Sequence, residues 1–242
     1  MEDSEMACGH EPETSPMNMS ATSVIDEYSS DPRFIESQRE FRSLLFDIAR
    51  SSGPTREGSP VEGSADGTQP SPTIISSHIK DVVTTRERVV LLKNYVNEVA
   101  PWLDMFDAEQ AFVREIPILA KSSAALTYAI LAISARQIER QNKIQGEQSS
   151  LALYQEAIKS LAPHLQARDD KILAACVILC CLEMMSAAPK NWRKHLDGCA
   201  ALFESNGING FSTGIPQAVF WCYARMGRWY HMQCKSLKFA AG

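Results

Sequence analysis

The chain has 242 residues, of which 45% are hydrophobic and 22% charged, so it can bury one sizeable core and is not a wholly disordered protein. The formal net charge of −5 gives no reason to expect a nucleic-acid-binding surface over the molecule as a whole. The negative charge is concentrated in residues 1–84, and residues 85–242 are slightly positive. This asymmetry is typical of an acidic arm on a folded domain. A solvated arm is favoured over an autoinhibitory or interaction tail.

The first part of the chain, residues 1–83, predicts a disordered acidic region rich in Ser and Pro. The first residues lack the apolar core of a secretory signal. No run in the sequence approaches the roughly 18 apolar residues that a membrane span needs, so we expect an intracellular, soluble protein.

One amphipathic helix is predicted inside this region, near residues 34–50. Its apolar positions have helical spacing: Phe41, Leu44, Leu45 and Ile48. The following segment, 51–73, is rich in Gly, Pro and Ser and is interpreted as a linker. Because an isolated helix of this length is marginal in water, it either docks on the main domain or binds a partner, and docking is favoured.

The ordered domain is predicted to span 84–232. It begins with a helix capped by Thr84, which has Glu87 at capping-box spacing. Pro101 is expected to end this helix near Ala100. A short helix from Ala108 to Arg114 is expected to stop before Pro117.

Five further segments complete the predicted domain. Ser122 or Ser123 opens a helix to about Asn142, Ser149 or Ser150 opens one that Pro163 kinks or ends, and Asp169 or Asp170 opens one from Lys171 to Met185. That last helix is apolar nearly all round and should be the central one. Asn191 caps a helix over Trp192–Ser205, Asn206 and Gly207 end it, and a final helix starts at about Pro216. The pattern predicts an all-α fold of antiparallel helical hairpins in an irregular array, with a C-terminal tail over 233–242.

The cysteines favour a reducing compartment, because their number is odd and most lie in apolar segments: Cys8, Cys176, Cys180, Cys181, Cys199, Cys222 and Cys234. Cys176 and Cys180 are four residues apart, as are His195 and Cys199, so a four-ligand zinc site is one reading. Small buried hydrophobes on amphipathic helices are the favoured reading, and no metal site is predicted.

No catalytic motif is present, and we predict that the protein is not an enzyme. His195 is interpreted as a structural or surface residue. The triplet Arg193–Lys194–His195 is interpreted as a solvated helix turn, with phosphate binding as the alternative. Trp102 is interpreted as a core anchor at a corner, with a binding platform as the alternative.

Six segments together resemble the fungal-specific transcription factor domain, the helical regulatory region of fungal zinc-binuclear-cluster transcription factors. They are APWLDMFD, IPILAKSSAALTYAILAISARQ, SLALYQEAIKSLAPHL, LAACVILCCLEMMS, WRKHLDGCAALF and INGFSTGIPQAVFWCYAR. The resemblance runs from about Arg88 to Arg225. It implies a nuclear regulator of RNA polymerase II transcription, often a dimer, whose helical domain senses metabolites or restrains an activator.

The sequence departs from the family in two ways. The family reads DNA with a cluster of six cysteines that holds zinc, but only Cys8 precedes Cys176 here, so we expect no zinc cofactor and no specific DNA binding from this chain. The family's helical region normally continues beyond Arg225 into helices that MGRWYHMQCKSLKFAAG does not resemble, so we expect only the front part of that domain. Protein partners are expected, as a homodimer or a heterodimer with related transcription factors. The alternative is a generic helical adaptor with no role in transcription.

Overall fold

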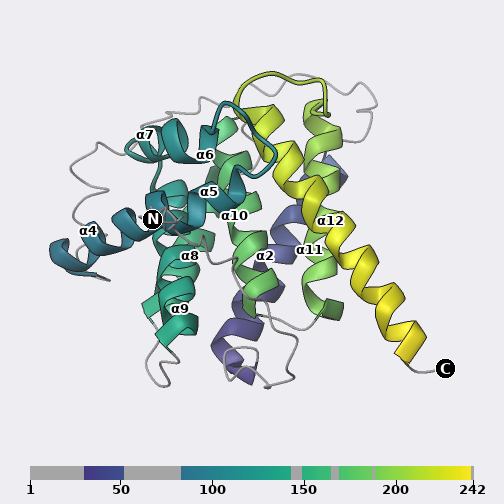
Figure 1. Ribbon diagram of the computed structural model, residues 1–242, viewed down its shortest axis with the longest axis horizontal. Coiled ribbons are helices and arrows are strands. Elements are labelled where there is room, and N and C mark those ends of the chain that lie inside the picture. The colour runs from purple at the N-terminus through teal and green to yellow at the C-terminus, as the bar shows by residue number, and fades with distance from the viewer. Residues whose placement is uncertain (1–29, 52–82, 143–148, 165–168, 187–188, 241–242) are drawn as a thin grey trace, which may run out of the picture.

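In the computed structural model, the described residues are 30–51, 83–142, 149–164, 169–186 and 189–240 (Figure 1). Every regular element in these ranges is helical, which confirms the predicted all-α class. In chain order they are α2 (Pro32–Ser51), α4 (Thr85–Asn94), η1 (Tyr95–Val99), α5 (Ala100–Leu103), α6 (Ala111–Arg114), α7 (Ile116–Ala120), α8 (Ala124–Asn142), α9 (Ser149–Leu161), η2 (Ala162–His164), α10 (Asp170–Ser186), α11 (Pro189–Asn206) and α12 (Ile215–Ala240). No helix within the described ranges is long and apolar enough to cross a membrane.

Helix α4 begins where the sequence predicts, with a complete capping box. The Thr84 hydroxyl accepts a hydrogen bond from the backbone N–H of Glu87 at 3.2 Å, and the Glu87 carboxylate accepts one from the backbone N–H of Thr84 at 2.8 Å. Two amides that a helix start would leave unpaired are thereby satisfied.

The predicted stop at Pro101 is wrong, because the helical run continues from α4 through η1 into α5. The η1 segment is a π-helical turn, and Pro101 lies in the first turn of α5. In a regular α-helix, a proline ring clashes with the carbonyl of the residue four positions earlier. The wider π turn before Pro101 relieves that clash. The run ends at Asp104, whose carboxylate accepts hydrogen bonds from the backbone N–H groups of Phe112 and Val113, both at 2.9 Å.

The predicted short helix Ala108–Arg114 is observed only from Ala111, because the Asp107 carboxylate accepts the Ala111 N–H at 2.8 Å in the preceding turn. The short helix ends at Arg114, before Pro117, as predicted, and a separate helix, α7, follows. Pro117 occupies the first turn of α7, a position where its missing N–H costs nothing.

Helices α8 and α9 pack along one another as a hairpin (Figure 1). Ser123 caps α8 as predicted, with its hydroxyl accepting the Leu126 N–H at 3.3 Å. At the start of α9, the buried Glu139 of α8 accepts the Ser150 N–H at 3.0 Å. The α9 helix ends at Leu161 and passes into the short turn η2, which contains Pro163 as the sequence predicts.

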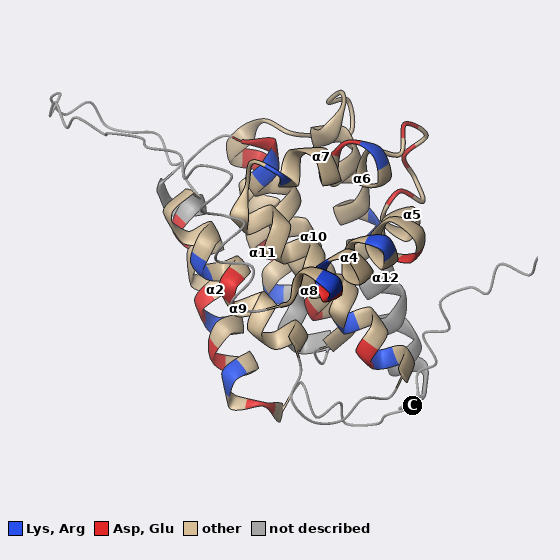
Figure 2. Cartoon of the chain, turned by 90° about the vertical axis from the view of Figure 1, so that its left-hand side faces the viewer, with Lys and Arg blue, Asp and Glu red and all other residues tan. Residues whose placement is uncertain are grey.

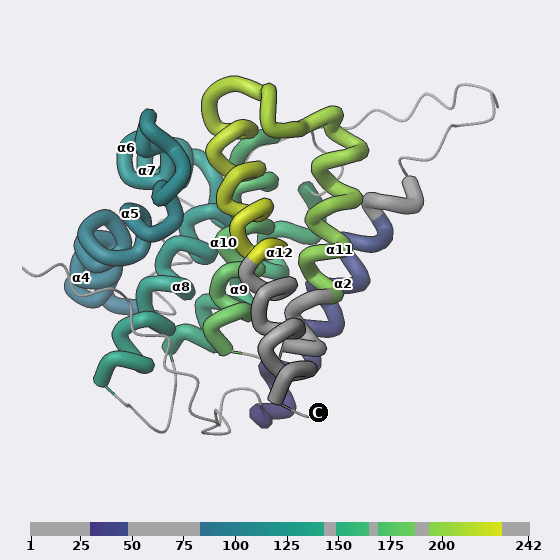
Figure 3. The backbone as a smooth tube through the Cα atoms, turned by 45° about the vertical axis from the view of Figure 1, so that its right-hand side comes forward, coloured from purple at the N-terminus to yellow at the C-terminus, as the bar shows by residue number. Residues whose placement is uncertain are grey.

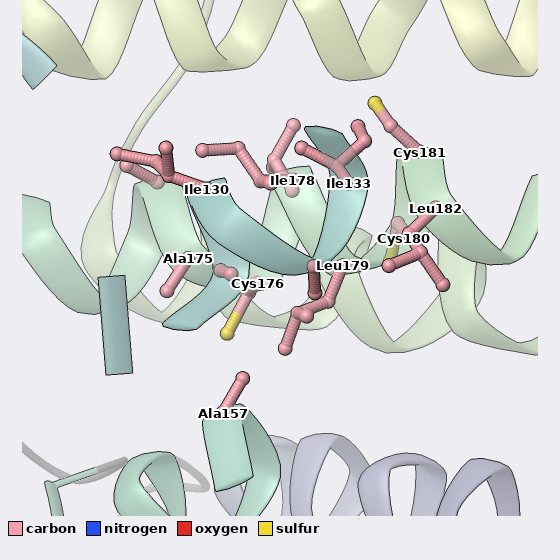
Figure 4. Close-up of a cluster of buried hydrophobic side chains, with 14 of the residues drawn as sticks. Ile130, Ile133, Ala157, Ala175, Cys176, Ile178, Leu179, Cys180, Cys181 and Leu182 are labelled. Atoms are coloured by element: carbon pink, nitrogen blue, oxygen red, sulfur yellow. The ribbon is translucent and has the colours of Figure 1, made fainter. Parts of the chain in front are cut away.

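Helix α10 is the central helix, as its apolar sequence predicts. It contacts α7, α8, α9, α11 and α12, and from Ile172 to Ser186 every side chain is buried. Figure 4 shows its residues, including Ile178 and Leu179, packed with Ile130 and Ile133 of α8. A helix without a polar face is stable only when neighbours surround it.

One helix boundary at the C-terminal side differs from the prediction. Helix α11 begins at Pro189 and not after Asn191, because proline is well suited to the first helical turn. It ends as predicted: Gly207 has φ +68°, and the Ile208 N–H donates to the Phe203 carbonyl at 2.9 Å. Helix α12 runs on to Ala240, past the predicted domain end at 232, and the predicted division into a domain and a tail over 233–242 stays a prediction.

The amphipathic helix predicted near 34–50 is observed as α2, and it docks on the domain alongside α11 (Figure 3). Its outer side carries acidic and basic side chains interspersed (Figure 2). The predicted disorder of the remainder of 1–83 concerns residues that lie outside the described ranges, apart from those next to α2 and α4.

Candidate functional site

Helix α2 is held by an apolar stripe that faces α9 and α11. Phe34, Phe41 and Leu45 are all buried and lie at helical spacing on one face. The ring of Phe34 lies 5.6 Å from the ring of Tyr154 on α9, and the ring of Phe41 stacks at 5.5 Å on that of His195 on α11. The packing is therefore that of an amphipathic helix laid into a groove.

Helices α2 and α11 approach closely at Gly198. A Cβ atom at this position would lie 2.7 Å from the Cβ of Leu45, so any larger residue forces the helices apart. We call the surface under α2 the α2 groove, and define it by the residues that α2 contacts there: Tyr154, Gln155, Glu183, His195 and Gly198.

A fully buried polar cluster lies at the floor of the α2 groove. Glu183 of α10 accepts a hydrogen bond from the Tyr154 hydroxyl on one carboxyl oxygen. Its other oxygen, Oε2, accepts one from the Gln38 Nε2 of α2 at 3.2 Å and lies 3.0 Å from His195 Nε2. Four helices thus meet at one carboxyl group, and α2 supplies one of its partners.

Burial sets the charge of this cluster. Desolvation raises the pKa of Glu183 to about 8, against the opposing effect of the hydrogen bonds from Tyr154 and Gln38 and the charge of Arg42. Burial lowers the pKa of His195 to about 3, with the charges of Arg42 and Lys194 acting in the same direction. Both groups are therefore uncharged at neutral pH, and their contact is a neutral hydrogen bond.

His195 has one further feature. Its second ring nitrogen, Nδ1, is buried and has no hydrogen-bond partner among the described residues. One face of the ring stacks on Phe41 of α2, and the side chain is buried. An imidazole with this pKa is a weak base at neutral pH.

The cysteines lie where the favoured sequence interpretation puts them, as buried small hydrophobes. The alternative interpretation was a four-ligand zinc site made of Cys176, Cys180, His195 and Cys199, and the described residues do not form it. His195 is engaged with Glu183, while the sulfur atoms of Cys180 and Cys199 lie 3.3 Å apart. Among the described residues, no group of three or more His, Cys, Asp or Glu has the geometry to hold a metal ion. The side chains of Cys8 and Cys234 lie outside the description.

Two other candidates from the sequence are also placed. Trp102 is half-buried at the edge of the core. The guanidinium of Arg225 lies 4.3 Å above its ring and donates to its carbonyl at 2.5 Å. In the basic triplet, Lys194 is exposed whereas His195 is buried, so the triplet does not form one solvated basic turn. The side chains of Arg193 and Trp192 lie outside the described part.

The sequence reading did not single out Glu183 or Gln38. The available signal was Glu183 itself, the one charged residue in the apolar stretch from Ile172 to Met185, because a charged group in such a stretch needs buried partners. Gln38 gave no signal, because a Gln on the polar-looking start of α2 is expected to face water.

The fold and the α2 groove together define a helical domain that binds a helix on its surface. The family model described as "Fungal specific transcription factor domain" matches residues 90–232, more than half of the chain. The chain belongs to this family, as the resemblance in the sequence indicated. The matched region takes in α9, α10 and α11, which form the α2 groove, and leaves out α2 itself. No curated protein and no solved structure matches the chain.

Proposed function

We propose that this protein regulates transcription by RNA polymerase II in the nucleus, and that its helical domain does so through contacts with other proteins. The observation that carries the proposal is the family match over 90–232, a family whose description assigns it to transcription factors. The matched residues contain the whole domain side of the α2 groove, which is a surface already adapted to hold a helix.

The proposal includes no catalytic step. The only acid and imidazole in contact within the described residues, Glu183 and His195, are both buried beneath α2 and neutral at pH 7. Their arrangement suits a structural role, because the buried Glu183 carboxyl group is held by contacts with Tyr154, Gln38 and His195. No zinc cofactor and no specific DNA contact are assigned to any residue of this chain.

The proposal is tested by tethering. The full chain is fused to an unrelated DNA-binding module, and an RNA polymerase II reporter carrying the matching site is measured in fungal cells. We expect reporter output to change several-fold and the untethered tagged protein to accumulate in the nucleus. Leu179→Asp, which places a charge at a fully buried position of α10, should abolish the effect, whereas Glu204→Gln at an exposed position should leave it intact.

An unchanged reporter together with retention of the tagged protein in the cytoplasm would refute the proposal. That combination would favour the alternative of a helical adaptor with no role in transcription.

A further inference from the structure

Helix α2 behaves as a ligand of the domain to which it is attached. It lies outside the matched family region, and its contacts are with α9 and α11 and, through Gln38, with Glu183 of α10. Four of the exposed positions on its other side are charged: Glu36, Arg39, Glu40 and Asp47. Among the described helices, α2 packs mainly against α9 and α11, so α2 can leave without separating the other described helices from one another.

The described contacts between α2 and its groove run from Phe34 to Leu45. Phe34 meets Tyr154, Phe41 meets His195, and Leu45 fits the space left by Gly198. Between the apolar contacts, Gln38 donates to Glu183 at 3.2 Å.

A second polar contact lies beside it, where the Ser37 hydroxyl accepts a hydrogen bond from Gln155 Nε2 at 3.2 Å. The groove therefore selects a helix with two Phe and a Leu at helical spacing and with a polar amide and hydroxyl in between, and α2 meets all of these requirements.

None of these contacts depends on which chain carries α2. The segment that joins α2 to α4 is residues 52–84. At the ~3.3 Å per residue of a fully extended chain, its reach is on the order of 100 Å, enough for α2 to arrive at the domain of a neighbouring molecule. Exchange of an identical element between two copies loses no native contact, which is the condition for domain swapping.

We propose that the α2 groove is a helix-docking site that binds α2 of a second copy of this chain in exchange for its own. Two copies then hold each other by reciprocal exchange, with one α2 in each groove. The attached α2 competes at an effective concentration of about 1 mM, so isolated molecules keep their own helix and exchange increases where copies are concentrated together. This goes beyond the proposed function and does not depend on it, since the exchange requires no nuclear location or promoter.

The contact between Leu45 and Gly198 gives a matched pair of full-length variants. Leu45→Arg disables α2 and leaves the groove intact, while Gly198→Leu blocks the groove and leaves α2 intact. We expect each variant alone to sediment as a monomer and the equimolar mixture to form a 1:1 complex. The double variant Leu45→Arg with Gly198→Leu, mixed with Leu45→Arg, is the control and should remain monomeric, because no intact α2 is present.

A second measurement uses a fluorescent peptide of residues 32–51. We expect it to bind the Leu45→Arg chain about 100-fold more tightly than the wild-type chain, whose groove is occupied, and a peptide carrying Leu45→Arg to bind neither. If circular dichroism shows that the Leu45→Arg chain is unfolded, the Phe41→Ala chain, whose substitution is less disruptive, replaces it as the acceptor.

Two results would overturn the inference. If folded variants remain monomeric when mixed at about 100 μM each, a second copy does not fill the groove, whether or not the peptide binds. If the peptide does not bind either acceptor variant, the groove does not accept a helix in trans at all.

Discussion

Replacing Glu183 by Gln should change how the stability of the protein depends on pH. The pKa of Glu183 in the folded protein is raised to about 8 from its ordinary value of 4.5. Between these values the folded state keeps a proton that the unfolded state releases, so the free energy of unfolding falls as the pH rises through this window. At about 1.4 kcal/mol per pH unit, the loss by pH 7 is on the order of 3 kcal/mol.

Glutamine cannot ionise but keeps a carbonyl oxygen for Tyr154 and an amide that can donate to His195. The Glu183→Gln variant should therefore lack this loss, and the difference in unfolding free energy between variant and wild type should grow in favour of the variant from pH 5 to pH 8. His195 acts in the opposite direction. Its pKa is lowered to about 3 from 6.5, so its contribution is present above pH 6.5 and is lost as the pH falls towards 3.

Urea unfolding followed by circular dichroism at 222 nm, repeated at half-unit steps from pH 5 to pH 8, measures this difference. Glu204→Gln, at an exposed position, is the matched control and should give a curve parallel to the wild type. Subtracting curves removes the contributions of other carboxylates, which both proteins share. Parallel curves for Glu183→Gln and wild type would show that the buried carboxyl does not stay protonated as we argue.

Three further predictions follow from single contacts. Gly198→Ala should release α2, since the new Cβ would lie 2.7 Å from that of Leu45; limited proteolysis should then cut α2 sooner, even though alanine favours helix α11 by about 1 kcal/mol. Asp104→Asn should cost about 1–2 kcal/mol in chemical unfolding, because one of its two backbone hydrogen bonds at 2.9 Å loses its acceptor. Arg225→Ala should cost about 1–3 kcal/mol, because the stacking on Trp102 and the bond to its carbonyl are both lost, whereas Arg228→Ala should be nearly neutral.

Much of the fold was predictable because local chemistry and tertiary packing agree. The capping box at Thr84 and the left-handed stop at Gly207 each satisfy backbone groups locally, so their sequence signals were sufficient. The all-apolar α10 could only be central. Pro101 was misjudged, because a proline that would end one helical turn also suits the first turn of the next, whereas the short helix before Pro117 does end at Arg114 as predicted.

The α2 groove was only partly predictable. Periodicity indicated Phe41 and Leu45 and favoured docking, and the structure confirms both. Where α2 docks depends on Gly198, which leaves room for Leu45. The sequence around Gly198 does not indicate this, because Leu45 lies more than a hundred residues away along the chain. The partnership of Gln38 with Glu183 is likewise a tertiary contact without a local pattern.

The order of α2 and α11 along the chain has a consequence for biosynthesis. Helix α2 leaves the ribosome before α11, against which it packs, and α11 is completed only after roughly 150 more residues, about 10–30 s later at ~5–20 residues per second. During that interval the side chains of Phe41 and Leu45 lack their native packing partners on α11. The nascent chain therefore exposes a short hydrophobic segment. Chaperones that capture emerging chains should therefore meet α2 before α11 can cover it, and α2 can dock only after α11 has been synthesised.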